Sequence, residues 1–144
     1  MRRSAILHSF ILPAIAVAAL AAAAGCGATS NPVAATPATT TDTFTDTVAH
    51  SGSAVHTFTV SATGTVNISL TAVSPLSTMA LGVGIGTWDG TTCGTSFSTN
   101  TDARSGATAL TGTATAGNYC VRVYDSGNVP ENWAVDFTID VVHP

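Results

Sequence analysis

The chain has 144 residues, which is enough for one compact domain and leaves little room for a second. Charged residues make up only 8% of the chain, and small and hydroxylated residues dominate it, which argues against a helical bundle or coiled coil and favours an all-β fold. The formal net charge is −4, and the chain has no cluster of cations of the kind that nucleic-acid binding requires, so DNA and RNA are excluded as partners.

Residues 1–25 have the features of a secretory signal peptide. Arg2 and Arg3 give a positively charged start, an apolar run follows over residues 5–24, and small residues precede Cys26. A transmembrane helix is the other interpretation, because the run is nearly long enough to span a bilayer, but Pro13 interrupts it. We expect residues 1–25 to be removed, which would leave two arginines against eight acidic residues and a net charge of −6.

The segment Ala23-Ala24-Gly25-Cys26 resembles the lipobox of bacterial lipoproteins, with Ala23 where that family usually has leucine. In the family, the cysteine becomes the first mature residue and its sulfur receives a diacylglycerol. The resemblance implies that Cys26 is the lipidation site and that the lipid bilayer is a partner. It also implies a protein of the cell envelope, lipid-anchored to a bacterial membrane and facing the periplasm or the exterior.

Residues 26–43 are predicted to form a disordered linker that begins with the lipidated cysteine. This stretch is rich in threonine and alanine and contains Pro32 and Pro37, so it cannot bury enough apolar surface to order itself. Proline stiffens such a spacer, which would hold the folded part of the chain away from the bilayer.

The chain has three cysteines, so a lipidated Cys26 leaves Cys93 and Cys120 as an even pair. In an oxidising compartment such a pair most simply forms a disulfide. A metal site or a redox pair is the alternative, but these cysteines form no CxxC motif and have no histidine near them in the sequence.

From residue 44 onward, apolar residues alternate with polar or small ones, which is the pattern of half-buried β-strands. Turn-forming residues separate these runs. Seven or eight short strands at this spacing predict an antiparallel β-sandwich, in which two facing sheets bury the apolar stripes of both. The residues expected on the apolar faces are Phe44, Val48, Phe58, Val60, Val66, Ile68, Leu70, Met79, Leu81, Val83, Ile85, Leu110, Tyr119, Val121, Val123, Trp133, Val135, Phe137, Ile139 and Val141.

Gly82, Gly84 and Gly86 alternate with apolar residues of one predicted strand. Their spacing superficially resembles a nucleotide-binding loop, but no helix follows them, so the required context is missing. We expect this row of glycines to permit the close approach of another chain segment or to leave a flat exposed patch.

The segment Ala116-Gly117-Asn118-Tyr119-Cys120-Val121-Arg122-Val123-Tyr124 resembles a characteristic strand of the bacterial pre-peptidase C-terminal (PPC) domain. Residues 55–60 and 64–70 resemble two earlier strands of that family, and the resemblance runs from Phe44 to Val142. It implies that residues 44–144 form a stand-alone, non-catalytic β-sandwich of jelly-roll type. Some members of the family help in substrate adhesion and some bind calcium. The acidic residues of one family strand are replaced here by Met79-Ala80-Leu81-Gly82, which puts calcium binding by that strand in doubt.

Few residues point to catalysis or metal binding. His50, His56 and His143 could form a zinc site only if the fold brought them together, and we expect them to be solvated or edge residues. Asp136 and Asp140 share one face of a predicted strand, where Arg122 is a candidate neighbour. The chain has no G-x-S-x-G motif. We therefore expect no enzyme activity, no metal and no cofactor, with a small hydrolase as an alternative.

Trp88, in the turn Trp88-Asp89-Gly90, is the candidate ligand contact. A tryptophan beside a tight turn can stack on a sugar ring or anchor a protein contact, and the other interpretation is that it closes the end of the sandwich. Together these features predict an envelope lipoprotein whose domain is a non-catalytic binding, adhesion or accessory module for an extracellular or periplasmic protein or glycan. A carbohydrate-binding module that uses Trp88 is the alternative.

Overall fold

The computed structural model describes residues 36–94 and 96–144, so the signal peptide, Cys26 and the beginning of the linker lie outside the described residues. The described residues form eight β-strands, which confirms the predicted all-β fold. The strands are β1 (Thr40–Ala49), β2 (Ser53–Val60), β3 (Gly64–Ser74), β4 (Leu81–Thr87), β5 (Ser98–Ala103), β6 (Ala107–Ala114), β7 (Gly117–Tyr124) and β8 (Ala134–His143). No helix among these residues is long and apolar enough to cross a bilayer.

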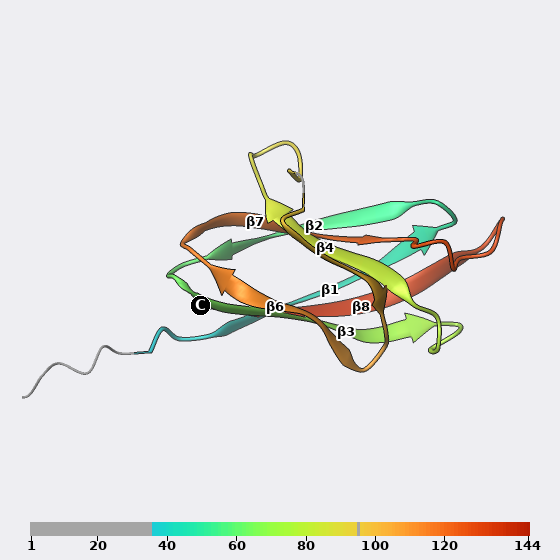
Figure 1. Cartoon of the computed structure of the whole chain (residues 1–144), viewed down its shortest axis with the longest axis horizontal. Coiled ribbons are helices and arrows are strands. Elements are labelled where there is room, and N and C mark those ends of the chain that lie inside the picture. The colour runs from blue at the N-terminus through green and yellow to red at the C-terminus, as the bar shows by residue number, and fades with distance from the viewer. Residues whose placement is uncertain (1–35, 95) are drawn as a thin grey trace, which may run out of the picture. The chain divides into compact units, whose positions relative to one another are not determined.

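The strands form two antiparallel sheets of four strands each, with the orders β1-β8-β3-β6 and β2-β7-β4-β5. Each strand of the first half of the domain pairs with its counterpart in the second half: β1 with β8, β2 with β7, β3 with β6, and β4 with β5. This nested pairing is the strand order of a jelly roll, in which one long hairpin is folded over into two sheets. Figure 1 shows the two layers stacked, with β2, β7 and β4 on one side and β1, β8, β3 and β6 on the other.

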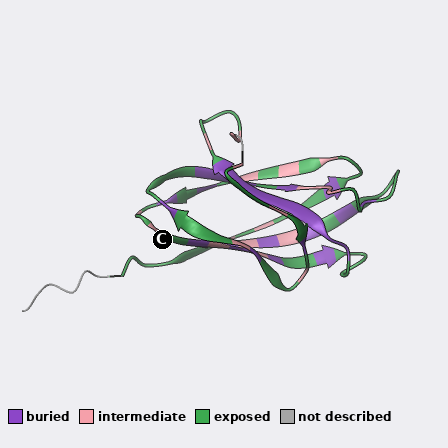
Figure 2. Cartoon of the chain, in the orientation of Figure 1, coloured by how far each residue is buried: buried purple, intermediate pink, exposed green. Residues whose placement is uncertain are grey.

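The core lies between the sheets and follows the predicted alternation. In β8, every second residue from Val135 to Val141 is at most 1% exposed, whereas the residues between them are exposed or half-buried. Figure 2 shows this alternation as bands of buried and exposed residues along the strands. Each fully buried Val, Leu, Ile or Phe side chain contributes about 1.5–3 kcal/mol relative to its exposed state. The largest fully buried side chains are Phe137, Ile68, Leu70, Leu81, Ile139, Val48, Val60, Val83, Val121, Val123, Val129 and Val135.

The first strand begins earlier than the composition of the linker suggested. Residues 40–43, the end of the expected linker over 26–43, pair with the end of β8 and belong to β1. Thr43 Oγ1 donates a hydrogen bond to Asp140 at 2.7 Å, and Asp42 lies 3.0 Å from the ring of His143. Threonine suits both linkers and strands, so only the partner strand decides its structure here.

The strands differ from the sequence prediction in two other places. β5 was not predicted, because Ala103 is its only buried residue and an apolar alternation is therefore missing. Trp133 was placed on the apolar face of the last strand, but its side chain is 47% exposed. It precedes β8, in a turn where its backbone N–H donates to the carbonyl of Pro130 at 3.1 Å and its carbonyl accepts from His50 N–H at 3.1 Å.

Candidate binding face

The row of glycines in β4 seats other parts of the chain on the outer face of the β2-β7-β4-β5 sheet. Gly82, Gly84 and Gly86 occupy the positions of β4 that face away from the core. They are nevertheless buried, because neighbouring groups lie directly on them. A Cβ atom at Gly82 would overlap the ring of Tyr124, and one at Gly84 would lie 2.7 Å from Ser96 Oγ. The expectation that these glycines permit the close approach of another segment is therefore confirmed.

The segment laid over Gly84 and Gly86 belongs to the connection between β4 and β5, described over residues 88–94 and 96–97. At Gly86, an added Cβ would lie 2.7 Å from the carbonyl oxygen of Gly94 in this connection. Gly94 N–H donates to the carbonyl of Thr87 at 2.9 Å, and Phe97 N–H donates to the carbonyl of Ile85 at 3.0 Å. These backbone hydrogen bonds hold both arms of the connection against β4.

A disulfide fixes the same connection to the middle of the sheet. Cys93 is bonded to Cys120 of β7, as the cysteine count predicted. Trp88 forms an isolated β-bridge with Cys93. The backbone N–H of Trp88 donates to the carbonyl of Asn118 at 3.0 Å. The tip between Trp88 and Cys93 is thereby tied to both β4 and β7.

Asp89 organises the tip itself. Its carboxylate accepts hydrogen bonds from the backbone N–H and the hydroxyl of Thr92, both at 2.7 Å, and from the backbone N–H of Thr91 at 2.8 Å. These bonds, above all the one from the backbone of Thr92, hold the pKa of Asp89 well below its usual range. Gly90 has φ of +102°, a conformation that other residues rarely adopt.

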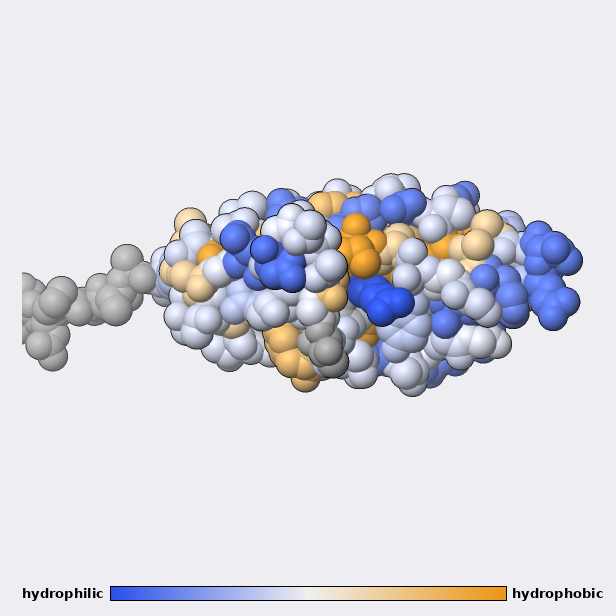
Figure 3. Space-filling model, turned by 90° about the horizontal axis from the view of Figure 1, so that it is seen from above, coloured by the Kyte–Doolittle hydropathy of each residue, from blue (hydrophilic) through white to orange (hydrophobic). Residues whose placement is uncertain are grey.

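Two surface hollows lie on this face and share Arg122 and Cys93. One, of about 390 Å³, contains Trp88 with Val55 and Thr57 of β2. The other, of about 560 Å³, lies toward Ser96, Thr99 and Tyr124. Figure 3 is viewed from above Figure 1, on the side of β2, β7 and β4, and shows a largely hydrophilic surface with hydrophobic patches between the polar groups. We call this surface the Arg122 face, made up of Ser53, Val55, Thr57, Trp88, Thr91, Thr92, Cys93, Gly94, Ser96, Thr99, Arg122 and Tyr124.

Arg122 carries a positive charge that no carboxylate of the described residues neutralises. Arg104 lies 2.8 Å from Asp102, whereas no ion pair within 4.0 Å forms at Arg122 in the part of the chain that the structure describes. Its guanidinium donates to Ser53 Oγ at 3.2 Å and lies 6.0 Å from the centre of the Tyr124 ring. The second distance is at the outer limit of a cation–π attraction, and the single hydrogen bond to Ser53 leaves further guanidinium donors for a ligand.

Trp88 is half-buried and lines the smaller hollow rather than the core of the sandwich. The interpretation in which it closes the end of the sandwich is therefore not supported, and ligand contact by Trp88 stays a prediction. Arg122 was considered only as a neighbour of Asp136 and Asp140, which is wrong. Both carboxylates belong to β8, in the sheet that does not contain Arg122. Asp136 accepts a hydrogen bond from the hydroxyl of Thr47 and Asp140 from that of Thr43, both at 2.7 Å.

The histidines pair with separate carboxylates. His143 lies 3.0 Å from Asp42, and His56 lies 3.2 Å from Asp46 without the alignment of a hydrogen bond. His50 lies 3.6 Å from Asp125. Within residues 36–94 and 96–144, no three side chains of His, Cys, Asp or Glu gather as metal ligands would.

Asp125 is a buried carboxylate that the sequence marked only as part of a turn. Its side chain is 2% exposed and accepts hydrogen bonds at 2.8–3.0 Å from the backbone N–H groups of Ser51, Gly127, Asn128 and Val129. Burial alone would raise the pKa of Asp125, but these four donors outweigh it and lower the pKa. Asp125 therefore fixes the turn after β7 against the turn between β1 and β2.

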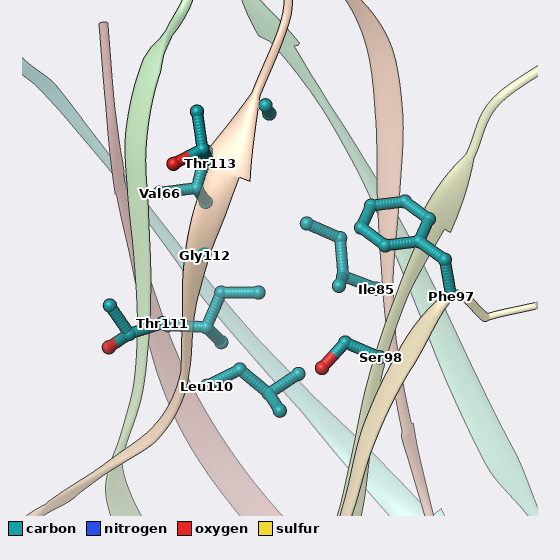
Figure 4. Close-up of a pocket in the computed structure, with 10 residues that line it drawn as sticks. Val66, Ile85, Phe97, Ser98, Leu110, Thr111, Gly112 and Thr113 are labelled. Carbon is teal, nitrogen blue, oxygen red and sulfur yellow. The ribbon is translucent and has the colours of Figure 1, made fainter.

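An apolar gap also opens between the two sheets near β6. Figure 4 shows Val66, Ile85 and Leu110 pointing into it, with the ring of Phe97 beside them. Its volume is about 30 Å³, which holds little more than a water molecule. This gap is therefore too small for an organic ligand, and the Arg122 face is the better candidate site.

No protein-family model matches this chain, and no curated protein matches it. The structure by itself establishes an all-β domain in which two four-stranded sheets form a jelly-roll sandwich.

Proposed function

We propose that this protein is a cell-envelope lipoprotein, anchored through an acylated Cys26, whose single β-sandwich is a non-catalytic binding module. The signal-peptide features and the resemblance to a lipobox support export and anchoring. The disulfide between Cys93 and Cys120 supports an oxidising compartment.

The observation that carries the binding role is the Arg122 face. It combines an unpaired cation, a half-buried tryptophan and a row of hydroxyl groups on a rigid sheet. Binding residues commonly lie on loops that a rigid scaffold positions, and here a disulfide fixes the loop that carries Trp88. A preformed surface loses less conformational entropy when a ligand binds.

The resemblance to the PPC domain supports the same role. The segment that resembles the family most, residues 116–124, forms β7 and supplies Arg122 and Tyr124 to this face. We propose that the domain is a relative of that family and serves in adhesion or as an accessory to another envelope protein.

The anchoring part is tested by substituting Cys26→Ala and by treating cells with globomycin. Both treatments should abolish labelling with radioactive palmitate and release the protein from the membrane fraction. Unchanged membrane retention of the Cys26→Ala protein would contradict the proposal. Non-reducing peptide mapping of the same samples reports whether Cys93 and Cys120 remain bonded.

A carbohydrate-binding module is the second candidate, because Trp88 lines a hollow together with Thr57, Thr91 and Thr92. A glycan array probed with the full chain tests it. Trp88→Ala should remove the signal, whereas Trp133→Ala, which changes an exposed tryptophan outside the face, should leave it intact. An array without any signal would exclude this candidate for the glycans displayed.

A further inference from the structure

We propose that the Arg122 face recognises a uronic-acid glycan, with Arg122 holding the sugar carboxylate and Trp88 packing against a sugar ring. This inference rests on the proposed binding function and names its ligand class. It starts from the charges of the domain: the described residues contain eight acidic residues and two arginines, and Arg104 is already paired with Asp102.

Arg122 is placed for a ligand carboxylate. Its only hydrogen-bond acceptor among the described residues is Ser53 Oγ, and the Tyr124 ring lies beside its guanidinium. Guanidinium groups bind carboxylates through two parallel N–H···O bonds, which are about twice as strong as neutral hydrogen bonds. The planar guanidinium is also pre-organised for such a pair, so less freedom is lost for each hydrogen bond formed.

The surroundings of Arg122 fit a sugar better than a peptide. The smaller hollow is lined by Trp88 and by Thr57, Thr91 and Thr92 together with Arg122, so an aromatic residue and polar residues meet there. Neither hollow is part of the apolar gap between the sheets, and that gap, at about 30 Å³, is too small for a large hydrophobic peptide side chain.

The two hollows suit a chain of sugars rather than one. They adjoin each other at Arg122 and Cys93, with volumes of about 390 Å³ and about 560 Å³. Each lies in the range of about 300–1,000 Å³ that is usual for small-molecule sites. A glycan that crosses Arg122 would therefore have hydroxyl-lined surface on both sides of its carboxylate.

The net charge of −6 expected for the mature chain repels an acidic polymer. Binding therefore requires that the attraction between Arg122 and the sugar carboxylate exceed this repulsion. At physiological ionic strength, exposed charges more than about 8 Å apart are largely screened. Asp89 is the carboxylate of the Trp88 turn, and it already accepts hydrogen bonds from Thr91 and Thr92. These bonds lower the pKa of Asp89 and keep its carboxylate charged, so the inferred preference for an acidic sugar requires the ligand carboxylate to lie at Arg122 and away from Asp89.

The test measures calorimetric affinity of the full chain, purified with detergent, for an oligogalacturonate, its fully methyl-esterified counterpart and an oligoglutamate peptide. We expect the acid to bind at least about tenfold more tightly than the ester, because only the acid offers the guanidinium a charged acceptor. Arg122→Gln should remove this difference by weakening binding of the acid more than binding of the ester. Arg104→Gln is the matched control and should change neither affinity.

The outcomes separate this inference from the broader proposal. Equal binding of acid and ester would overturn the carboxylate preference and leave a neutral-glycan module in place. Tighter binding of the oligoglutamate would overturn the sugar and leave a protein-binding module. Absence of binding to all three probes, with circular dichroism showing the sandwich intact, would overturn the inference, while the fractionation of the Cys26→Ala protein would still test the anchored lipoprotein.

Discussion

The disulfide between Cys93 and Cys120 is expected to contribute a large part of the stability of the domain. The bond joins residues separated by 27 positions, and loop-closure entropy assigns a loop of that length about 3.5 kcal/mol at 25 °C. Cys120 is 0% exposed, so alanine is the appropriate replacement, because it adds no polar group to a buried position. The variant is the double substitution Cys93→Ala and Cys120→Ala, which leaves no unpaired thiol of this pair.

The assay is urea unfolding of the full chain followed by far-ultraviolet circular dichroism, with and without reductant. Reduction of the wild type and the double substitution should each lower the free energy of unfolding by about 3.5 kcal/mol, and the melting temperature by roughly 15 °C. The double variant should not respond to reductant, which controls for other effects of the reagent. Superimposable unfolding curves for the oxidised and reduced wild type would refute the reasoning.

Two further predictions concern the glycines and the buried carboxylate. Gly82→Ala should cost about 1–3 kcal/mol, because the new methyl group displaces the Tyr124 ring, whereas Gly112→Ala, which meets no atom within 4 Å, should gain about 0.5–1 kcal/mol. Thermal melts that rank the two variants in the opposite order would contradict the packing on β4. Asp125 has a folded-state pKa below its ordinary value of 3.8, so the stability it contributes is present above that value and is lost as the pH falls through the folded pKa. The free energy of unfolding of Asp125→Asn should therefore fall less steeply between about pH 5 and about pH 2 than that of the wild type, and parallel profiles would count against this role.

The sequence predicted those parts of the fold in which an apolar stripe is enough to define the structure. β8 shows this best, because Val135, Phe137, Ile139 and Val141 all lie in the core as their alternation requires. β5 could not be found in this way, since an edge strand with one buried alanine has no stripe. Trp133 shows the opposite failure. Its position in the sequence continues the alternation of β8, but it lies in a turn before that strand begins.

The candidate site was only partly predictable, because it depends on contacts between distant segments. Trp88 and the cysteine pair stood out by their residue types, and the glycine row predicted that something would approach β4 closely. The sequence did not show which segment approaches β4. The folded structure shows that it is the segment carrying Trp88, which packs on the glycines and is held there by the disulfide. Arg122 was visible as one of two arginines after residue 26, but only the folded sheet shows that it has no carboxylate partner among residues 36–94 and 96–144.

The central claim is that ligand binds on the outer face of the β2-β7-β4-β5 sheet. The most direct test is a nuclear magnetic resonance titration of the isotope-labelled full chain, in detergent micelles, with the oligogalacturonate. The side-chain N–H signals of Trp88 and Arg122 report on the two groups expected to touch the ligand. Both signals should shift together with backbone signals of β2 and β7, and those of β1 and β8 should stay in place. Shifts confined to β1 and β8, with the Trp88 and Arg122 signals unmoved, would contradict the claim.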